Sequence, residues 1–337
     1  MSSPKPIVPK IAWVIFGCVA LRLLFSWMMG NEWALFAQPE VADYLVSQSQ
    51  PTTQAPVMIT QPLTEAVLIT QPPAPEPTTL PVVTEEPYLF RKTDVSYIDI
   101  NYSANRTPDI ESLLTQPLDW DLAADEPTVL IIHSHGTEAY LPGDGYTYTE
   151  EGGEYRTLDD QCNMLSLGEE LARLLNEAGI ITVQDRSYYD YPDYLTSYDN
   201  ARIGLQEQLN RYPTVKLVID LHRDSAQRAD GSQWATETII NGEKSAQVML
   251  VMGTDSYYTH PNWEQNLSVA LKLQAIMEKT HGSSTRPLDL RKQRFNQDLS
   301  VGAIIAEIGA AGNTYQEAQN AVSVLAEAII LLANGAN

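Results

Sequence analysis

The sequence predicts an α/β fold with a mostly parallel sheet, helices on both faces and an antiparallel hairpin at one edge. From residue 128 onward, short apolar runs rich in β-branched residues alternate with longer amphipathic stretches, which is typical of β-α-β units. In addition, Asn241-Gly242 separates two apolar runs, and this dipeptide favours a tight hairpin. We expect an N-terminal transmembrane helix and a disordered linker to precede this domain.

The apolar runs predict strands, and the stretches with helical spacing predict helices, some of which end at a glycine. Ligands of such sheets bind beyond the carboxyl ends of the strands, so functional residues are expected there. In chain order we expect a strand at 128–132, a helix at 161–178, a strand at 180–183, a helix at 199–211, a strand at 216–221, hairpin strands at 235–240 and 247–252, a helix at 262–281, a strand at 302–308 and a helix at 315–334.

Residues 11–29 form an apolar segment long enough to cross a bilayer as a helix. Lys5 and Lys10 precede it, so the positive-inside rule puts the N-terminus in the cytoplasm and the rest of the chain outside. We therefore predict a cytoplasmic stub and membrane anchor over residues 1–30. A cleaved signal peptide is the main alternative and would also export the chain; a buried soluble helix is a third.

Residues 31–88 have the composition of an acidic spacer. Ten of the chain's 21 prolines lie between Pro39 and Pro87, and the spacer contains neither Lys nor Arg. It also lacks a period that could bury one face, so we expect it to be disordered. Proline keeps such a segment extended and would hold the following domain away from a membrane. The folded domain that would carry the function is then expected over residues 89–337.

The charge balance argues against nucleic acid as a partner. The 337 residues include 21 Lys and Arg against 43 Asp and Glu, a formal net charge of −22, so the chain repels phosphate backbones. The two cysteines, Cys18 and Cys162, exclude a disulfide framework and a cysteine-rich zinc site. We expect no internal disulfide.

Chemically capable side chains stand where three of the predicted strands end. His135 and Glu138 follow the first strand, His222 ends the third, and Glu307 lies near the end of the last. Because parallel strands bring their carboxyl ends to one edge of a sheet, we expect these side chains to meet. Two imidazoles and one carboxylate form a common catalytic zinc set, with a fourth position for water.

The sequence therefore predicts a Zn²⁺ site made by His135, Glu138 and His222. A nearby carboxylate must take a proton from water and pass it to the leaving amine, and Glu307 is the candidate. Arg223 could stabilise a developing oxyanion or bind a substrate carboxylate. Each residue also has a structural interpretation, since H-x-x-E pairs arise by chance and strand-end histidines are usually hydrogen-bonded within a fold. His133 could be a supporting donor, and Asp220 and Asp224 could pair with Arg223 or touch metal.

Four segments resemble the stage II sporulation protein P family of endospore-forming bacteria. They are VLIIHSHGTEAYLP at 129–142, VIDLHRDS at 218–225, VMGTD at 251–255 and RFNQDLSVGAIIAEIGAAGNTYQEA at 294–318. The resemblance implies a relation to zinc-dependent N-acetylmuramoyl-L-alanine amidases, with His135 and His222 as zinc ligands and Glu307 as the catalytic carboxylate. Glu138 is preferred as the third ligand because it lies within the matched motif. Asp159, Asp160 and Glu154 remain alternatives.

The resemblance also implies a biological setting. A membrane-anchored zinc hydrolase would cleave the N-acetylmuramoyl-L-alanine amide bond and peptide cross-links of peptidoglycan while the mother cell engulfs the forespore. Its expected partner is the lytic transglycosylase stage II sporulation protein D, and its expected place is the mother-cell side of the septal membrane. Two other classes stay open: a non-catalytic peptidoglycan-binding or scaffold protein on an amidase fold, and a zinc carboxypeptidase, which would need an arginine clamp for a free C-terminus.

Overall fold

The computed structural model describes residues 67–68, 89–118, 120–142, 147–153 and 155–335, all within the unit that spans Thr60–Asn337. The membrane segment predicted at 11–29 and nearly all of the linker predicted at 31–88 lie outside the described residues. Within the described ranges, no helix combines the length and the apolar character that crossing a bilayer requires.

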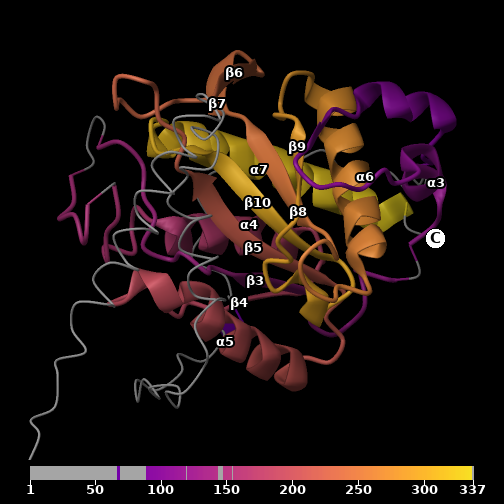
Figure 1. Ribbon diagram of the computed structural model, residues 1–337, viewed down its shortest axis with the longest axis horizontal. Helices are drawn as coiled ribbons and strands as arrows, with labels where there is room; N and C mark the ends of the chain where they lie inside the picture. Colours follow the sequence, from indigo (N-terminus) through magenta and orange to yellow (C-terminus); the bar gives the residue numbers. More distant parts are fainter. Residues whose placement is uncertain (1–66, 69–88, 119, 143–146, 154, 336–337) are drawn as a thin grey trace, which may run out of the picture. The chain divides into compact units, whose positions relative to one another are not determined.

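A central sheet has the strand order β1-β4-β3-β5-β10-β8-β9-β2 (Figure 1). Strands β4, β3, β5 and β10 are parallel to one another, and so are β8, β9 and β2. The two groups meet antiparallel between β10 and β8, so the sheet is mostly parallel, as predicted. The bounds are β1 Val67–Leu68, β2 Ile100–Tyr102, β3 Val129–Ile132, β4 Thr182–Gln184, β5 Leu217–Asp224, β8 Val248–Gly253, β9 Leu288–Arg291 and β10 Ala303–Ala310.

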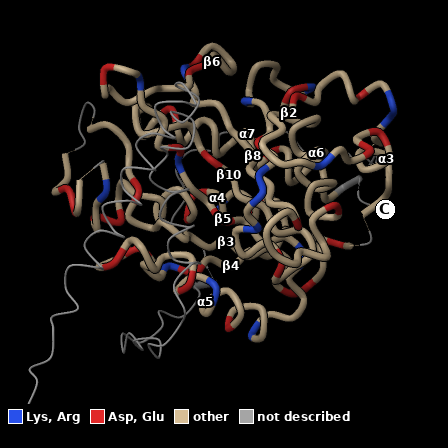
Figure 2. The backbone as a smooth tube through the Cα atoms, in the orientation of Figure 1, with Lys and Arg blue, Asp and Glu red and all other residues tan. Residues whose placement is uncertain are grey.

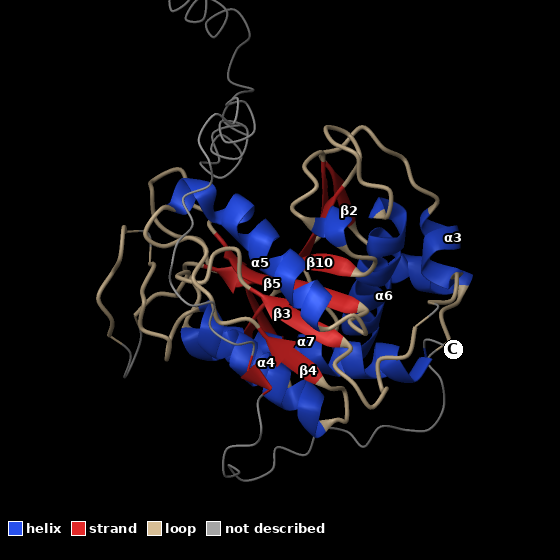
Figure 3. Cartoon of the chain, turned by 90° about the horizontal axis from the view of Figure 1, so that it is seen from below, coloured by secondary structure: helices blue, strands red, loops and turns tan. Residues whose placement is uncertain are grey.

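Helices cover both faces of the sheet, which confirms the predicted layering (Figure 3). Helices α4, α6 and α7 share one large apolar cluster with the short helix α3, whereas α5 packs through a second cluster on the other face. Three 3₁₀ turns, η2, η3 and η4, lie in the connections. The bounds are η2 Lys92–Tyr97, α3 Ile110–Thr115, α4 Met164–Glu177, η3 Tyr194–Thr196, α5 Ser197–Arg211, α6 Trp263–His281, η4 Gln297–Leu299 and α7 Tyr315–Gly335.

The hairpin prediction is right about the turn and wrong about the second strand. Asn241 and Gly242 both have positive φ, 53° and 86°, as a two-residue turn requires. This turn joins β6 (Glu237–Ile240) to β7 (Glu243–Ala246) in a separate two-stranded sheet. A two-residue turn pairs the residues that follow it at once, so the apolar run further along could not be the returning strand.

That apolar run forms β8, and all six of its residues are buried. A strand without polar residues on either face needs cover on both, so it lies inside the sheet between β10 and β9. The predicted edge hairpin is therefore wrong, because β8 lies in the interior beside β10; the antiparallel strand at the edge of the sheet is the short β1, which pairs with β4.

The acidic excess is spread along the described chain. Figure 2 shows Asp and Glu positions on many loops and helices, with Lys and Arg among them. On α4, for example, Arg173 pairs with Glu170 at 2.6 Å and Glu177 at 2.7 Å. Partly exposed pairs of this kind contribute about 0–1 kcal/mol each.

Candidate active site

The strands β5 and β10 bring His222 and Glu307 side by side. The two residues are partners in the parallel register, so their side chains leave the same face of the sheet. His135 lies in the turn after β3, with its ring centroid 5.2 Å from that of His222. Glu138 Oε2 lies 3.5 Å from His222 Nδ1. The structure thus brings His135, Glu138, His222 and Glu307 together near the carboxyl ends of the central strands β3, β5 and β10.

The turn that carries the H-x-x-E pair is fixed by its own backbone. The Glu138 amide donates to His135 O at 3.3 Å, and the amide of Met164, the first residue of α4, donates to Glu138 O at 2.9 Å. Glu138 is fully buried. Its carboxylate also accepts a 3.1 Å hydrogen bond from the Arg223 backbone amide. Glu138 is therefore held rigidly between β5 and the start of α4.

Arg223 is part of this support. Its side chain is only 1% exposed, its Nε donates to Ala139 O at 3.0 Å, and its Nη1 lies 3.9 Å from Glu138 Oε1. A guanidinium buried in this way holds the carboxylate and the turn behind it. The arrangement favours a positioning role for Arg223 over the contact with substrate that the sequence suggested.

The charge states of the cluster follow from burial and from the carboxylates. Burial lowers the pKa of His135 to about 3, so its imidazole is neutral at physiological pH. Burial would lower the pKa of His222 too, but the Asp220 and Glu138 carboxylates raise it well above its ordinary value. Burial opposes ionisation of Glu138, yet Arg223 and the two histidines hold its pKa below the usual range. The neutral imidazole of His135 and the carboxylate of Glu138 thus lie beside His222, whose ring also contacts the Asp220 carboxylate.

Asp220 contacts this cluster in a way the sequence did not indicate. Its Oδ1 lies 2.8 Å from His222 Nε2, and the same carboxylate accepts two hydrogen bonds from Ser134. The expected partners were Arg223 or a metal. The alternation of side chains along a strand predicts His222 as the partner, because residues two apart on β5 share a face. Asp224, in turn, pairs with Arg286 at 2.6 Å.

Aromatic rings surround the two histidines. Tyr194 stacks on His135 with centroids 4.4 Å apart, and Tyr198 meets His135 edge-on at 5.4 Å. The guanidinium of Arg156 covers the Tyr194 ring at 3.8 Å. Tyr194 lies on η3 and Tyr198 lies at the start of α5. The sequence shows no helical periodicity this early in the segment, so it did not indicate either tyrosine as part of the site.

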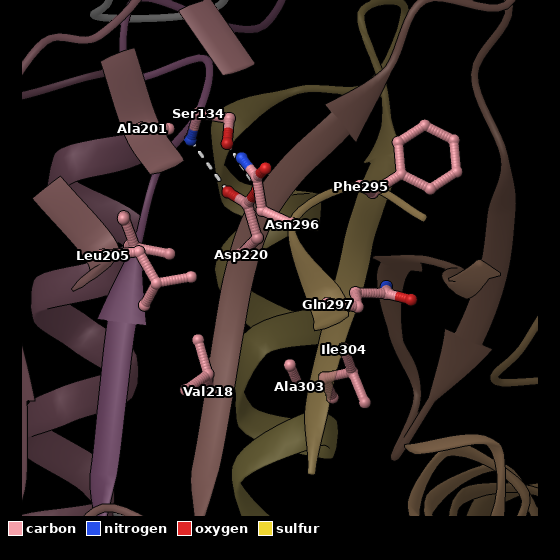
Figure 4. Close-up of a pocket in the computed structure, with 11 residues that line it drawn as sticks. Ser134, Ala201, Leu205, Val218, Asp220, Phe295, Asn296, Gln297, Ala303 and Ile304 are labelled. Atoms are coloured by element: carbon pink, nitrogen blue, oxygen red, sulfur yellow. Dashed lines mark hydrogen bonds between the residues drawn. The ribbon is translucent and has the colours of Figure 1, made fainter. Parts of the chain in front are cut away.

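The segment 294–300 contacts Tyr198 through a hydrogen bond and a ring contact. Phe295 and Asn296 have positive φ, 49° and 59°, and Asn296 Nδ2 donates to Tyr198 O at 2.8 Å. Phe295 packs against the Tyr198 ring at 5.8 Å. Asn296 also lines a small pocket together with Ser134 and Asp220 (Figure 4). Non-glycine residues with positive φ are uncommon and often mark functional sites.

The remaining sequence candidates are engaged elsewhere. His133 is fully buried, with Nδ1 3.2 Å from Leu221 O and Nε2 2.9 Å from Gln184 Nε2. Asp160 pairs with Arg186 at 3.0 Å and is half exposed, and Asp159 accepts from the Gln161 amide. Glu154 lies outside the described residues. These placements favour Glu138 as the carboxylate that accompanies the two histidines.

The donor chemistry fits a zinc ion, although the side chains are not arranged around one. Over the described residues, no group of three or more His, Cys, Asp or Glu is arranged so that it could hold a metal ion. Three buried atoms of the candidate ligands, however, His135 Nδ1, Glu138 Oε1 and His222 Nε2, have no hydrogen-bond partner. A neutral imidazole, a carboxylate and a second imidazole are donors that zinc prefers. The residues therefore match the predicted metal in kind.

Comparisons with known proteins find one family. The model of the stage II sporulation protein P family matches residues 78–330. Stage II sporulation protein P of Bacillus subtilis (strain 168) is 28% identical over 214 residues, which cover 60% of this chain and 50% of that protein. The chain thus spans about half the length of this relative.

Solved structures of amidases also align with the chain. The N-acetylmuramoyl-L-alanine amidase AmiC2 of Nostoc punctiforme is 15% identical with a TM-score of 0.34, over 60% of this chain and 94% of that one. The catalytic domain of CwlV, an N-acetylmuramoyl-L-alanine amidase from Bacillus (Paenibacillus) polymyxa var. colistinus, is 11% identical with a TM-score of 0.35, over 60% and 96%. Because the family model covers most of the sequence, the chain belongs to the stage II sporulation protein P family.

Proposed function

We propose that this chain is a membrane-anchored zinc hydrolase of peptidoglycan that cleaves the N-acetylmuramoyl-L-alanine amide bond and peptide cross-links during forespore engulfment. The observation that supports it most directly is the register pairing of Glu307 with His222, next to the 3.5 Å contact between His222 and Glu138. A candidate base thus adjoins a candidate ligand set. Membership of the sporulation family supplies the biological setting.

The residues have distinct roles in this proposal. His135, Glu138 and His222 would hold Zn²⁺, which when bound lowers the pKa of a water and polarises a carbonyl. Glu307 would accept the proton of the attacking water and deliver it to the leaving nitrogen. Tyr194 and Tyr198 would fix the histidine rings and limit access of bulk water. Arg223 would keep Glu138 in place from behind.

The burial of Arg223 bears on the carboxypeptidase alternative. A carboxypeptidase needs a cationic clamp for the free C-terminus of its substrate, and Arg223 was the candidate. Its guanidinium is buried and donates to Ala139 O inside the protein. The amidase reading needs no such clamp, so the geometry favours it.

Digestion of isolated peptidoglycan by the purified full chain with zinc tests this function. We expect mass spectrometry to show stem peptides released from glycan with new L-alanine amino termini, together with cleaved cross-links. His135→Ala should abolish release. The matched control is His281→Ala, because His281 pairs with Glu327 on the helical face away from the cluster.

Each rival class has its own signature. A scaffold protein would sediment with peptidoglycan and create no new ends. A carboxypeptidase would remove one C-terminal residue and leave the amide to the glycan intact. Full activity of His135→Ala would remove the zinc assignment.

The membrane and partner assignments rest on the sequence. In this proposal residues 11–29 anchor the chain with its N-terminus in the cytoplasm, and stage II sporulation protein D acts on the same peptidoglycan. Protease added to wall-free protoplasts before engulfment is complete should cut the proline-rich residues 31–88. Protection of this segment in such protoplasts, with cleavage after the membranes are permeabilised, would contradict the orientation.

A further inference from the structure

We propose that Asp220 is a positioning residue, which holds Nε2–H of His222 so that Nδ1 faces the metal position. The inference rests on the proposed function for the identity of the metal. It assigns to Asp220 a role other than the two that the sequence suggested, which were pairing with Arg223 and direct contact with the metal.

The two edges of the His222 ring meet different groups. Nε2 lies 2.8 Å from Asp220 Oδ1, whereas Nδ1 faces Glu138 Oε2 at 3.5 Å and the ring of His135 beyond. The Nε2 contact is close but does not meet the geometry of a hydrogen bond, so it is a short contact between the imidazole and the carboxylate. The edge that faces the other candidate ligands is therefore the Nδ1 edge.

Asp220 is itself held in one orientation. Oδ1 accepts from the Ser134 amide at 2.8 Å and Oδ2 accepts from Ser134 Oγ at 2.6 Å, as Figure 4 shows. The residue is only 7% exposed, and the Asn296 side chain lies beside it in the pocket. Since the Ser134 hydroxyl donates to Asp220 and not to His222, this trio lacks the serine–histidine bond of a nucleophilic triad. Ser134 instead orients the carboxylate.

A fixed carboxylate at Nε2 determines how His222 can bind a metal. A neutral imidazole has one N–H and one lone pair. With the proton drawn to Nε2 by Asp220, the lone pair lies on Nδ1. Carboxylate partners of this kind fix the ring and raise the basicity of the ligand atom, and their loss typically weakens metal binding by about 10–100-fold.

Zinc affinity of the full chain, measured by competition with a chromogenic chelator, tests the role. We expect Asp220→Ala to bind zinc about 10–100-fold more weakly than wild type. Asp220→Asn keeps an oxygen that can accept from Nε2–H and should recover part of the loss. Asp289→Asn is the matched control, because Asp289 is also 7% exposed, lies on a strand and accepts from a serine hydroxyl, Ser103 Oγ, away from His222.

A second measurement reports which nitrogen of the His222 ring carries the proton and which binds the metal. In the zinc-loaded chain with ¹⁵N-labelled histidine, long-range ¹H–¹⁵N spectra should show Nε2 of His222 protonated and Nδ1 bound to metal. Ser134→Ala, which keeps the backbone donor, should shift the affinity in the same direction by a smaller factor. This variant keeps the inference testable if Asp220→Ala fails to fold.

The outcomes separate the inference from the function. Unchanged zinc affinity in both Asp220→Ala and Ser134→Ala, or a metal on Nε2 in the wild type, overturns the role of Asp220 and leaves the hydrolase proposal standing. A wild-type chain that binds no zinc overturns both. The inference is supported if zinc binds more weakly to Asp220→Ala and part of the affinity returns in Asp220→Asn. Zinc affinity should stay at the wild-type level in Asp289→Asn.

Discussion

Glu307 on β10 and His222 on β5 are register partners in adjacent parallel strands. Their relative position is set by backbone hydrogen bonds of the sheet, so it does not depend on a mobile loop. Catalytic groups on strands are held more precisely than groups on loops. The candidate base and a candidate metal ligand therefore keep a fixed spacing before any substrate arrives.

Glu307→Gln should lower peptidoglycan hydrolysis by about 10²–10⁴-fold, because the amide is close in shape but cannot accept a proton. Zinc affinity should stay at the wild-type level, since Glu307 is not assigned to the ligand set. Product release measured by mass spectrometry and chelator competition give the two values. Glu317→Gln is a control, because Glu317 is a buried glutamate that bonds Asn313 and the Thr314 amide at the start of α7. Wild-type activity of Glu307→Gln would assign the base to another carboxylate.

Arg223→Met should lower the free energy of unfolding by about 3–5 kcal/mol, because it leaves the Glu138 carboxylate buried without its cation. The variant also removes the donor to Ala139 O. Denaturant unfolding of the full chain measures the change. Arg173→Met, which removes a partly exposed cation and its two ion pairs from α4, should cost at most about 2 kcal/mol. Equal losses in the two variants would show that Arg223 does not support Glu138.

Gly168→Ala should destabilise the chain although alanine is the better helix former by about 1 kcal/mol. A Cβ at this position on α4 would overlap Gln184 Nε2 and lie 2.6 Å from the His133 ring, and both side chains are buried. Overpacking of this kind costs about 1–3 kcal/mol. Thermal unfolding should show a lower midpoint than wild type, whereas Glu169→Ala, at an exposed position of the same helix, should change little. A raised midpoint in Gly168→Ala would mean that the helix shifts freely.

From a rule about strand ends, the sequence predicted that the candidate side chains lie close together, and the structure confirms this proximity where the strands are regular. His222 and Glu307 lie on eight-residue strands whose apolar runs are unambiguous. The strands β2 and β9 were not predicted, because their sequences, Ile-Asn-Tyr and Leu-Asp-Leu-Arg, are short and contain polar residues, so they form no apolar run. The apolar run of β8 was recognised as a strand, but its partner depended on the length of the turn before it.

The same limits explain the errors around the site. Arg223 and Asp220 looked like an ion pair because they are near in sequence, but neighbours at odd spacing on a strand point to opposite faces. Asp220 therefore meets His222, and Arg223 meets Glu138 from the other side. Tyr194 lies on a 3₁₀ turn and stacks on His135. No periodic pattern in the sequence predicts such a contact.

Lys272 gives a prediction about pH, away from the candidate site. It lies on α6, is 2% exposed, and its ammonium donates to Leu113 O at 2.9 Å, Leu114 O at 2.6 Å and Ser268 Oγ at 3.2 Å. These bonds tie α6 to the end of α3. Burial lowers the pKa of Lys272 to about 8, against about 10.4 for a lysine in an unfolded chain.

Between these two values the unfolded chain binds more protons than the folded one, so the stability contribution of Lys272 rises with pH. The cost of burying the charge is fully present below the folded pKa and is relieved as pH increases toward about 10. Denaturant unfolding of wild type and Lys272→Met at about pH 7 and about pH 10 measures this, because the variant cancels the effects of all other groups. The free-energy difference, wild type minus variant, should be larger at the higher pH. A difference that stays constant or falls with pH would show that the three hydrogen bonds hold the ammonium charged despite its burial.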